Sequence, residues 1–319
     1  MINNSINNVP IDAVISWVDG NDKDHQEKML PFVEKRLLNL KEFRTRFDQV
    51  EEIKFTVDSI LKFAPFIRNI YIVTDNQTPS FLKLEENQLK YSTVSIVDHK
   101  VIFSGVEEFL PTFNCRPIET RLYKIPNLSE YFIYFNDDMF LINPTNPTDF
   151  FIDGFPVLRG KWLKFDEDRF LKKFTEKYLR NKKLDSHRLA QQKGAKILGF
   201  KKYYKFHHVP YALRKSTFES FFESNKEIEV ENIRYKFRNL NQFTPQGLIN
   251  HLEIKNKTCV LSNKLQLIYM KPIRKSLWEL KYKLNSFSDN KLFLCLQSLD
   301  QCKPNKLKYL LNWLTFLVK

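Results

Sequence analysis

Short apolar runs recur along the first 150 residues of the chain, each bounded by polar or turn-forming residues. Residues 48–63 place apolar side chains at helical spacing and end shortly before Pro65, which predicts an α-helix. A second, shorter helix is expected around residues 117–124. Four other runs are rich in β-branched and aromatic residues, which is typical of buried strands; they cover residues 12–18, 69–74, 93–98 and 131–135.

Strands that alternate with helices over about 130 residues predict a Rossmann-like α/β fold with a mostly parallel sheet. From about Lys161 the chain changes to longer, basic, helix-forming segments such as residues 166–183. We therefore expect an α/β part, residues 1–160, and a basic, mainly helical C-terminal part, residues 161–319. Residues 306–319 are apolar nearly all round, which fits either a helix docked on the core or an interfacial membrane anchor.

Charge is distributed unevenly along the chain, whose formal net charge is +14. Residues 1–150 carry 16 Lys and Arg against 22 Asp and Glu, a net charge of −6. Residues 151–319 carry 35 against 15, a net charge of +20. A basic region beside an acidic one suits a phosphorylated ligand, an anionic polymer or a membrane surface, although a merely solvated basic surface has the same composition.

Cysteine usage and the absence of targeting signals favour a cytoplasmic protein. Neither structural zinc nor a disulfide framework is expected, because the four cysteines form no CxxC pair. The first twelve residues lack the regions of a signal peptide, and no run of 18 apolar residues predicts a spanning helix. Any membrane contact is therefore expected to be peripheral, at the inner face of the cytoplasmic membrane. The cysteines are Cys115, Cys259, Cys295 and Cys302.

An aspartate follows or ends each of the four predicted strands. The polar strand ends are residues 19–22, 74–76, 98–99 and 136–138. In parallel α/β sheets, ligands bind outside the carboxyl ends of the strands. A lone aspartate at such a place is more often a helix cap or a turn former, but four in succession favour a binding site.

The most unusual strand end is "FIYFNDDMFLI", residues 132–142, in which Asn136, Asp137 and Asp138 interrupt an apolar run. Burying two adjacent carboxylates is costly unless a cation, a proton or hydrogen-bond donors satisfy them. Carboxylates at a strand end can hold Mg²⁺ or Mn²⁺ on a nucleotide diphosphate. Because neighbouring strand side chains face opposite sides, one aspartate would serve such a site and the other would orient the loop.

Three further residues have side chains suited to phosphate chemistry. Glu119 has the spacing of an ordinary exposed helix residue. His208, in "HHVPYALRKS", could donate to a phosphate or shuttle a proton. Arg238, in "RYKFRNLNQF", is a natural bidentate partner of a phosphate. Taken singly, each of the three is better explained as a structural residue.

Four sequence blocks, taken together and in order, change this assessment. They are "IDAVISWVDGND", "APFIRNIYIVTDNQTPSFL", "LPTFNCRPIETRLYKIPNLSEYFIYFNDDMFL" and "HHVPYALRKS". In combination they resemble the Stealth family of hexose-1-phosphate transferases, which includes bacterial capsular polysaccharide phosphotransferases and the animal lysosomal-enzyme GlcNAc-1-phosphotransferase. The resemblance covers residues 11–150 closely and residues 205–245 more loosely.

The resemblance implies transfer of a sugar 1-phosphate from a UDP-sugar donor, such as UDP-GlcNAc, to a hydroxyl of a glycan or lipid-linked glycan acceptor. The acceptor would attack the β-phosphorus, form a phosphodiester and release UMP during capsule or surface polysaccharide synthesis. Mg²⁺ or Mn²⁺ is the implied cofactor. Residues 1–160 would then bind the nucleotide sugar, and residues 161–319 would complete the active site and carry the surface facing acceptor and membrane.

The family's essential glutamate, aspartate, histidine and arginine carry over onto Glu119, Asp138, His208 and Arg238. The resemblance implies that Asp138 serves the metal or the attacking hydroxyl, supported by Glu119. Arg238 and His208 would hold the diphosphate oxygens. The predicted metal ligands are Asp137 and Asp138.

The first strand ends are expected to form the substrate pocket. Trp17, Asp19 and Gly20 would contribute to the nucleotide site by stacking and hydrogen bonding. Asp75 and Asn136 are further substrate-binding candidates, whereas Asp98 and His99 fit a structural role equally well.

Two departures from the family pattern bear on substrate details. The common "FNS-x-AIE" reads "FNCRPIE" at residues 113–119. A family arginine in the helix after the first block corresponds to Lys54, which gives a point charge instead of a planar fork. The short chain favours a single transfer step over a polymerase with several activities.

Two other functions stay open at this point. A metal-dependent glycosyltransferase with a similar sheet would release UDP instead of UMP. A non-catalytic basic module would bind an anionic polymer or nucleic acid, but the aspartate-lined strand ends argue against it. We expect no nucleic-acid partner.

Overall fold

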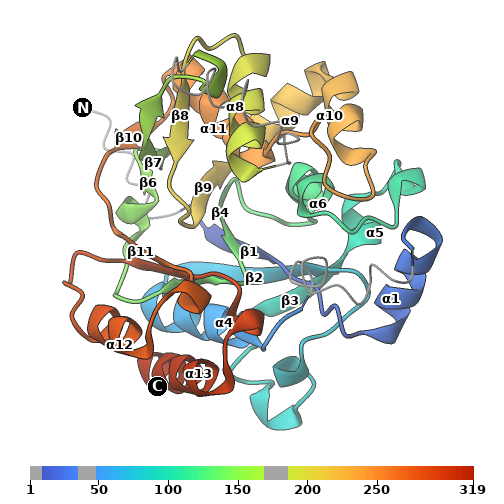
Figure 1. Ribbon diagram of the computed structural model, residues 1–319. Coiled ribbons are helices and arrows are strands. Elements are labelled where there is room, and N and C mark those ends of the chain that lie inside the picture. Colours follow the sequence, from blue (N-terminus) through green and yellow to red (C-terminus); the bar gives the residue numbers. More distant parts are fainter. Residues whose placement is uncertain (1–8, 35–47, 169–185) are drawn as a thin grey trace, which may run out of the picture.

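The computed structural model describes residues 9–34, 48–168 and 186–319, so the predicted basic segment at residues 166–183 lies almost wholly outside the described residues (Figure 1). The molecule is built on a five-stranded sheet with the order β3-β2-β1-β4-β9. Its first four strands are parallel and β9 is antiparallel to β4. The bounds are β1 (Ile11–Ser16), β2 (Ile67–Thr74), β3 (Val94–Asp98), β4 (Tyr131–Asn136) and β9 (Tyr211–Arg214).

This sheet confirms the Rossmann-like α/β class and all four predicted strands. β1 lies between β2 and β4, so Val14 pairs with Tyr71 on one side and Tyr134 on the other. The central residues of β1 are buried on both faces, which explains why "AVI" reads as a continuous apolar run instead of an alternating one.

The predicted helices of the first part are also present. The predicted helix 48–63 is α4 (Glu52–Phe63), which buries Ile53, Val57 and Ile60. The helix expected around residues 117–124 is α6 (Cys115–Arg121), capped by Asn114 and continued by a 3₁₀ turn. Two shorter helices follow β1 and β3 and are capped by aspartates; they are α1 (Lys23–Met29) and α5 (His99–Ile102).

Further helices and two small sheets, which take strands from both sides of residue 160, complete the described structure. One sheet has the order β10-β7-β6, with β8 also paired to β7, and the other has the order β11-β12-β5. Their strands are β5 (Met139–Leu141), β6 (Phe151–Ile152), β7 (Phe155–Leu163), β8 (Tyr203–Phe206), β10 (Val260–Ser262), β11 (Leu267–Met270) and β12 (Phe293–Leu296). The helices are α8 (His187–Ile197), α9 (Lys215–Ser224), α10 (Lys226–Ile233), α11 (Pro245–Asn256), α12 (Leu277–Asn285) and α13 (Pro304–Val318).

The two parts are joined through shared sheets. β7 runs across the boundary placed at residue 160, and β9 completes the sheet of the first part. β12 pairs with β5, which directly follows the "NDD" turn. The division at residue 160 therefore stays a prediction about the roles of the two parts. The edge strand β9 of the main sheet comes from the second part of the chain.

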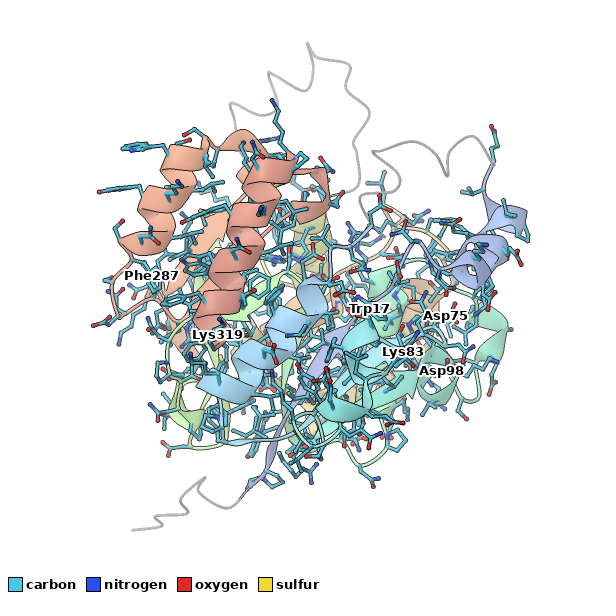
Figure 2. All side chains as sticks on the ribbon, turned by 90° about the horizontal axis from the view of Figure 1, so that it is seen from below. Trp17, Asp75, Lys83, Asp98, Phe287 and Lys319 are labelled. Carbon is cyan, nitrogen blue, oxygen red and sulfur yellow. The ribbon has the colours of Figure 1, made fainter. Side chains whose placement is uncertain are left out.

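The C-terminal helix α13 docks on the core. It buries Leu310 and Leu314, and Lys62 of α4 donates to the Leu317 carbonyl at 2.8 Å. Figure 2 shows α12 and α13 side by side with α4 beside them, away from Asp75 and Asp98. Within the described parts of the chain, no helix is long and apolar enough to cross a membrane.

Candidate active site

The backbone of the "NDD" turn is held from two sides at the carboxyl end of β4. The Thr56 hydroxyl of α4 donates to the Asp137 carbonyl at 2.7 Å. The Leu296 amide of β12 donates to the Asp138 carbonyl at 3.1 Å. These bonds hold the backbone of the turn. The position of Asp138 therefore depends on α4 from the first part of the chain and on β12 from the second.

Three side chains that are far apart in sequence converge at this turn. Asp138 Oδ1 lies 3.8 Å from His208 Nε2. The Cys295 thiol donates to Asp138 Oδ2 at 3.4 Å. One candidate ligand atom from each residue lies within 4.8 Å of the others. Asp138 follows β4, His208 connects β8 to β9, and Cys295 is on β12, so all three sheets contribute.

The two facing atoms of Asp138 and His208 are unsatisfied. Asp138 Oδ1 and His208 Nε2 are both buried atoms without a hydrogen-bond partner among the described residues. A buried polar atom left without a partner costs about 1–3 kcal/mol, and more when it is charged. The gap between them therefore suits a ligand hydroxyl, a water molecule or a cation.

Cys295 was not among the residues singled out by sequence. Its side chain is fully buried. Burial and the neighbouring Asp138 carboxylate raise the pKa of the Cys295 thiol well above its usual value, so it is a hydrogen-bond donor at neutral pH. No sequence signal could have found it, because the pairing of β12 with β5 joins residues more than 150 positions apart.

Asp137 faces different surroundings from its neighbour. Burial, followed by the charges of Glu52 and Asp138, raises the pKa of the Asp137 carboxyl well above its usual value. Burial likewise raises the pKa of Glu52 to about 7. The structure thus brings Asp138, and not Asp137, to His208 and Cys295. Asp137 as a metal ligand stays a prediction.

Glu119 is buried, unlike the exposed helix residue that its spacing alone suggests. The Tyr134 hydroxyl donates to Glu119 Oε1 at 3.0 Å and lies 2.6 Å from the Ser16 hydroxyl. Burial and then the Glu119 charge raise the pKa of Tyr134 well above its usual value. Burial, and then the charges of Glu119, Cys295 and Asp138, raise the pKa of Tyr211 well above its usual value. Tyr211 therefore lies within electrostatic reach of both proposed catalytic carboxylates.

Two arginines and a histidine lie near Cys115 and His208. Arg238 is exposed, and its Nη2 donates to Cys115 Sγ at 3.5 Å. Arg116 is buried and donates to the Asn239 carbonyl at 3.0 Å. The ring of His187 lies 5.9 Å from that of His208. Burial, and then the charges of His208, Arg116 and Arg238, lower the pKa of His187 to about 3. Sequence reasoning missed Arg116 and His187, which carry no motif signal of their own.

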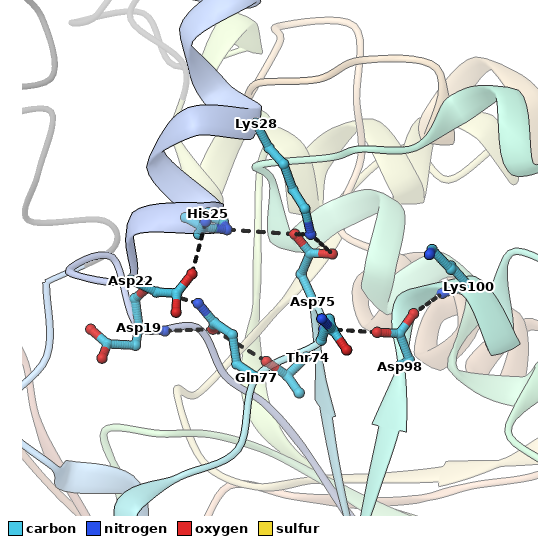
Figure 3. Close-up of polar contacts among 10 residues, drawn as sticks. Asp19, Asp22, His25, Lys28, Thr74, Asp75, Gln77, Asp98 and Lys100 are labelled. Atoms are coloured by element: carbon cyan, nitrogen blue, oxygen red, sulfur yellow. Dashed lines mark hydrogen bonds and ion pairs between the residues drawn. The ribbon is translucent and has the colours of Figure 1, made fainter.

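The ends of β1, β2 and β3 form a second polar cluster (Figure 3). The Gln77 side chain accepts from the Asp19 amide at 2.8 Å and donates to the Asp19 carbonyl at 2.9 Å. Asp75 accepts from Lys28 Nζ at 3.0 Å through each carboxylate oxygen. The two Asp98 oxygens accept from the amides of Asn76 at 2.7 Å and Lys100 at 2.8 Å. These carboxylates thus have strong local partners.

The remaining predicted pocket residues lie around this cluster and β4. Trp17 is only 7% exposed, and its Nε1 is buried without a hydrogen-bond partner among the described residues. The Gly20 carbonyl accepts from Gln26 at 2.7 Å. Asn136 ends β4 opposite Ser16. Lys54, at the position of the family arginine, pairs with Asp58 at 2.7 Å.

Asp138 is the residue of this centre that best fits Mg²⁺ or Mn²⁺. These hard ions prefer oxygen ligands and are commonly held by one or two carboxylates together with substrate phosphates. Imidazole nitrogen and thiol sulfur suit softer ions. The carboxylate of Asp138, which has an unsatisfied oxygen, therefore fits a hard cation, whereas His208 and Cys295 fit roles beside it.

Fold and site together define a Rossmann-like α/β protein with a polar centre at the carboxyl edge of its main sheet. Two family models match it: Stealth protein CR1, conserved region 1, at residues 9–36, and Stealth protein CR2, conserved region 2, at residues 46–158. With the relatives below, these matches show that the chain belongs to the Stealth family, as the sequence resemblance predicted.

Curated relatives extend the similarity beyond these two regions. The capsular polysaccharide phosphotransferase WcwK of Streptococcus pneumoniae is 31% identical over 255 residues, which cover 72% of this chain and 74% of the relative. The receptor polysaccharide phosphotransferase WefC of Streptococcus gordonii is 32% identical, with 72% and 73% covered. The capsular polysaccharide phosphotransferase fcs1 of Haemophilus influenzae is 36% identical, with 73% of this chain but only 62% of the relative covered.

Solved glycosyltransferase structures resemble the chain at low similarity. The galactosyltransferase LgtC in complex with donor and acceptor sugar analogs aligns with 96% of this chain and 95% of its own, with a TM-score of 0.46 and 11% identity. The apo-form glycosyltransferase GlyE in Streptococcus pneumoniae TIGR4 aligns with 96% of this chain and 62% of its own, with a TM-score of 0.44 and 10% identity.

Proposed function

We propose that this protein transfers a sugar 1-phosphate from a UDP-sugar to a hydroxyl of a glycan, forming a phosphodiester and releasing UMP in capsule or surface polysaccharide synthesis. Membership of the Stealth family and the names of its phosphotransferase relatives support this reaction class. The observation that carries the proposal is the pair of unsatisfied atoms, Asp138 Oδ1 and His208 Nε2, that face each other across 3.8 Å.

The proposed chemistry uses this gap for the acceptor hydroxyl. The hydroxyl oxygen forms a bond to the β-phosphorus of the donor, and its proton passes to His208 Nε2, since imidazole is the usual general base near neutral pH. The bond between the β-phosphorus and the bridging oxygen breaks, and UMP leaves with that oxygen. Glu119 would orient the Tyr134 hydroxyl beneath the reacting groups, given their 3.0 Å hydrogen bond.

Charge stabilisation would come from Arg238 and from a bound cation. Phosphoryl transfer depends largely on positioning and on neutralising the phosphate oxygens. Arg238 is exposed and donates to Cys115, and its planar guanidinium would bind the diphosphate oxygens, as the family resemblance implies. A bound Mg²⁺ or Mn²⁺, held by Asp138 and the phosphate oxygens, would supply further positive charge. The residues at the ends of β1 and β2 would enclose the nucleotide.

The acceptor is proposed to be a glycan or lipid-linked glycan handled at the inner face of the cytoplasmic membrane. On α12, Trp278 and Tyr282 are 72% and 63% exposed, and their rings stack at 5.7 Å. Aromatic side chains of this kind favour the membrane interface, and neighbouring lysines attract anionic lipids. This surface supports a peripheral contact through α12 better than through α13, whose Leu310 and Leu314 are buried.

The nucleotide product tests the proposal. The protein is incubated with UDP-GlcNAc, a glycan acceptor and Mg²⁺ or Mn²⁺, and the released nucleotide is identified by chromatography. UMP together with a phosphodiester signal in phosphorus NMR is the expected result. UDP would instead identify a conventional metal-dependent glycosyltransferase. If UDP-GlcNAc is not accepted, a panel of other UDP-sugars separates a wrong donor from a wrong reaction.

A further inference from the structure

One face of the β7–β8 pair carries four basic side chains, which we call the basic rungs: Arg159, Lys161, Lys205 and His207. Lys161 lies directly opposite Lys205 in the antiparallel register. The next positions along, Arg159 and His207, are also opposite each other, and the His207 amide donates to the Arg159 carbonyl at 2.9 Å. Since strand side chains alternate between faces, all four share one face.

This arrangement is unfavourable for the protein alone. Like charges directly opposite each other across two strands destabilise the pair. Lys161 and Lys205 are both exposed, and neither forms an ion pair in the described structure. Arg159 is buried, and its Nε donates at 2.8 Å to the neutral Gln266 side chain, not to a carboxylate. Among the described residues, no carboxylate forms an ion pair with the basic rungs, although the charge of Asp149 acts on Arg159 at longer range.

His207 links the basic rungs to the catalytic centre. Its Nδ1 is a buried atom without a hydrogen-bond partner among the described residues. Burial, and then the charges of Lys161, Lys205 and Arg159, lower its pKa. The next residue in the chain is His208, which faces Asp138. The charge of Lys205 also acts on His187, whose ring lies 5.9 Å from that of His208, so the rungs lie within electrostatic reach of the proposed position of the acceptor hydroxyl.

We propose that the basic rungs bind a phosphate group already present in the acceptor, so that the preferred substrate is an anionic, phosphodiester-containing glycan and not a neutral sugar. This inference rests on the proposed function, because the product of one transfer would carry the group that the rungs recognise in the next acceptor. A phosphate ester on the lipid end of a lipid-linked glycan has the same chemistry, and the experiment separates the two sources.

The experiment compares two acceptors and two matched double variants. One acceptor is an N-acetylglucosamine oligosaccharide with a single internal phosphodiester, and the other is the same oligosaccharide without phosphate. The variant Lys161→Gln/Lys205→Gln removes two charges from the rungs. The control Lys226→Gln/Lys308→Gln removes two exposed lysines from α10 and α13. KM for each acceptor is measured by UMP release, binding of each oligosaccharide without donor is measured by calorimetry, and binding to phosphatidylglycerol-containing vesicles is measured by co-sedimentation.

For the native protein we expect KM for the phosphodiester acceptor to be about tenfold or more below that for the neutral one, as for charge-assisted hydrogen bonds. The rung variant should lose this preference while its turnover of the neutral acceptor stays unchanged. The control variant, and Lys161→Arg/Lys205→Arg, should keep the preference. The rung variant should melt no lower than the native protein, because the substitution relieves cross-strand repulsion.

Three outcomes would overturn the inference. The rung variant could keep the native preference, which would make the rungs a solvated surface. It could keep the preference yet lose binding to phosphatidylglycerol-containing vesicles, which would assign the rungs to lipid headgroups. The native protein could bind both oligosaccharides equally in calorimetry. Absence of UMP with either acceptor, combined with preferential binding of the phosphodiester, would instead contradict the proposed function and leave the binding site supported.

Discussion

Two groups of aspartates at the same edge of the main sheet differ in how fully their oxygens are satisfied. Asp75 accepts hydrogen bonds from Lys28 through both oxygens, and Asp98 accepts one backbone amide on each oxygen. Asp138 has a thiol on one oxygen and no partner on the other within the described structure. All three follow the same pattern in sequence, an aspartate at or just after the end of a strand.

We therefore distinguish a structural aspartate from a reactive one by the hydrogen-bond partners of its carboxylate, because the position at a strand end is the same for both. A carboxylate with charged or amide donors on both oxygens contributes to folding and has little capacity left for a ligand. A carboxylate with a free oxygen beside an imidazole keeps that capacity, at a cost in stability. On this basis we expect the strand ends of β2 and β3 to support the loops and the strand end of β4 to carry the chemistry.

The largest effect is expected for Asp138→Asn. Turnover should fall at least about 10³-fold, because the substitution removes both the charge toward a cation and an acceptor for the attacking hydroxyl. Thermal stability should be unchanged or slightly higher, since Asn does not leave an unpaired buried charge. UMP release and a thermal melt measure the two quantities. Activity of Asp138→Asn within tenfold of the native protein would contradict the assignment of Asp138 as the reactive aspartate.

The opposite result is expected for Asp75→Asn, which should weaken the fold more than the chemistry. Loss of the ion pair with Lys28 and His25 should lower the free energy of unfolding by about 1–3 kcal/mol. Turnover at saturating donor should stay within about threefold. Chemical denaturation and UMP release provide the measurements. A loss of turnover comparable with that of Asp138→Asn would place Asp75 in the catalytic centre.

The same variant gives a pH test with a defined sign. Burial alone would raise the pKa of Asp75, but hydrogen bonds from His25 and Lys28 outweigh it and hold the pKa well below its usual value. A carboxylate whose pKa falls on folding stabilises the native state above its unfolded pKa near 4 and loses that contribution as the pH falls further. The difference in stability between native protein and Asp75→Asn should therefore shrink below about pH 4.

Local patterns in the sequence were enough for the first part of the fold, where strands and helices are long and follow one another. The strand β9 was not predicted, because "YALR" is only four residues long and is followed directly by α9. Its antiparallel pairing with β4 is a long-range contact. The sequence carries no local signal for such a contact, which depends on the packing of the whole sheet.

Only those site residues that lie in the family's sequence motifs could be predicted. Asp138 and His208 were predicted together through the family resemblance, and the structure brings them together at 3.8 Å. Cys295 and Arg116 were missed, since a fully buried thiol on β12 and an arginine on α6 join the site through tertiary packing. The spacing of Glu119 predicted an exposed helix residue, but its side chain is buried and accepts from the Tyr134 hydroxyl.

A smaller effect on activity is expected for Cys295→Ala. The thiol orients Asp138 through one weak hydrogen bond, so its removal should lower turnover by about tenfold or less. Cys295→Ser should restore most of the loss, because a hydroxyl donates to the same oxygen. UMP release from both variants measures this. A loss as large as that of Asp138→Asn, without rescue by serine, would instead make the sulfur itself part of the chemistry.

The smallest effect tests the structural side of the comparison at Asp98, which caps α5 through the Lys100 amide at 2.8 Å. Asp98→Ala should lower the free energy of unfolding by about 1 kcal/mol, the usual cost of losing an N-cap, and should leave turnover unchanged. Asp98→Asn is the matched control, because asparagine caps a helix about as well as aspartate. Denaturation curves and UMP release are compared for both. If Asp98→Asn kept the stability but lost more than about tenfold in turnover, the charge of Asp98 would serve the substrate, and satisfied oxygens would no longer distinguish structural from reactive aspartates at this sheet edge.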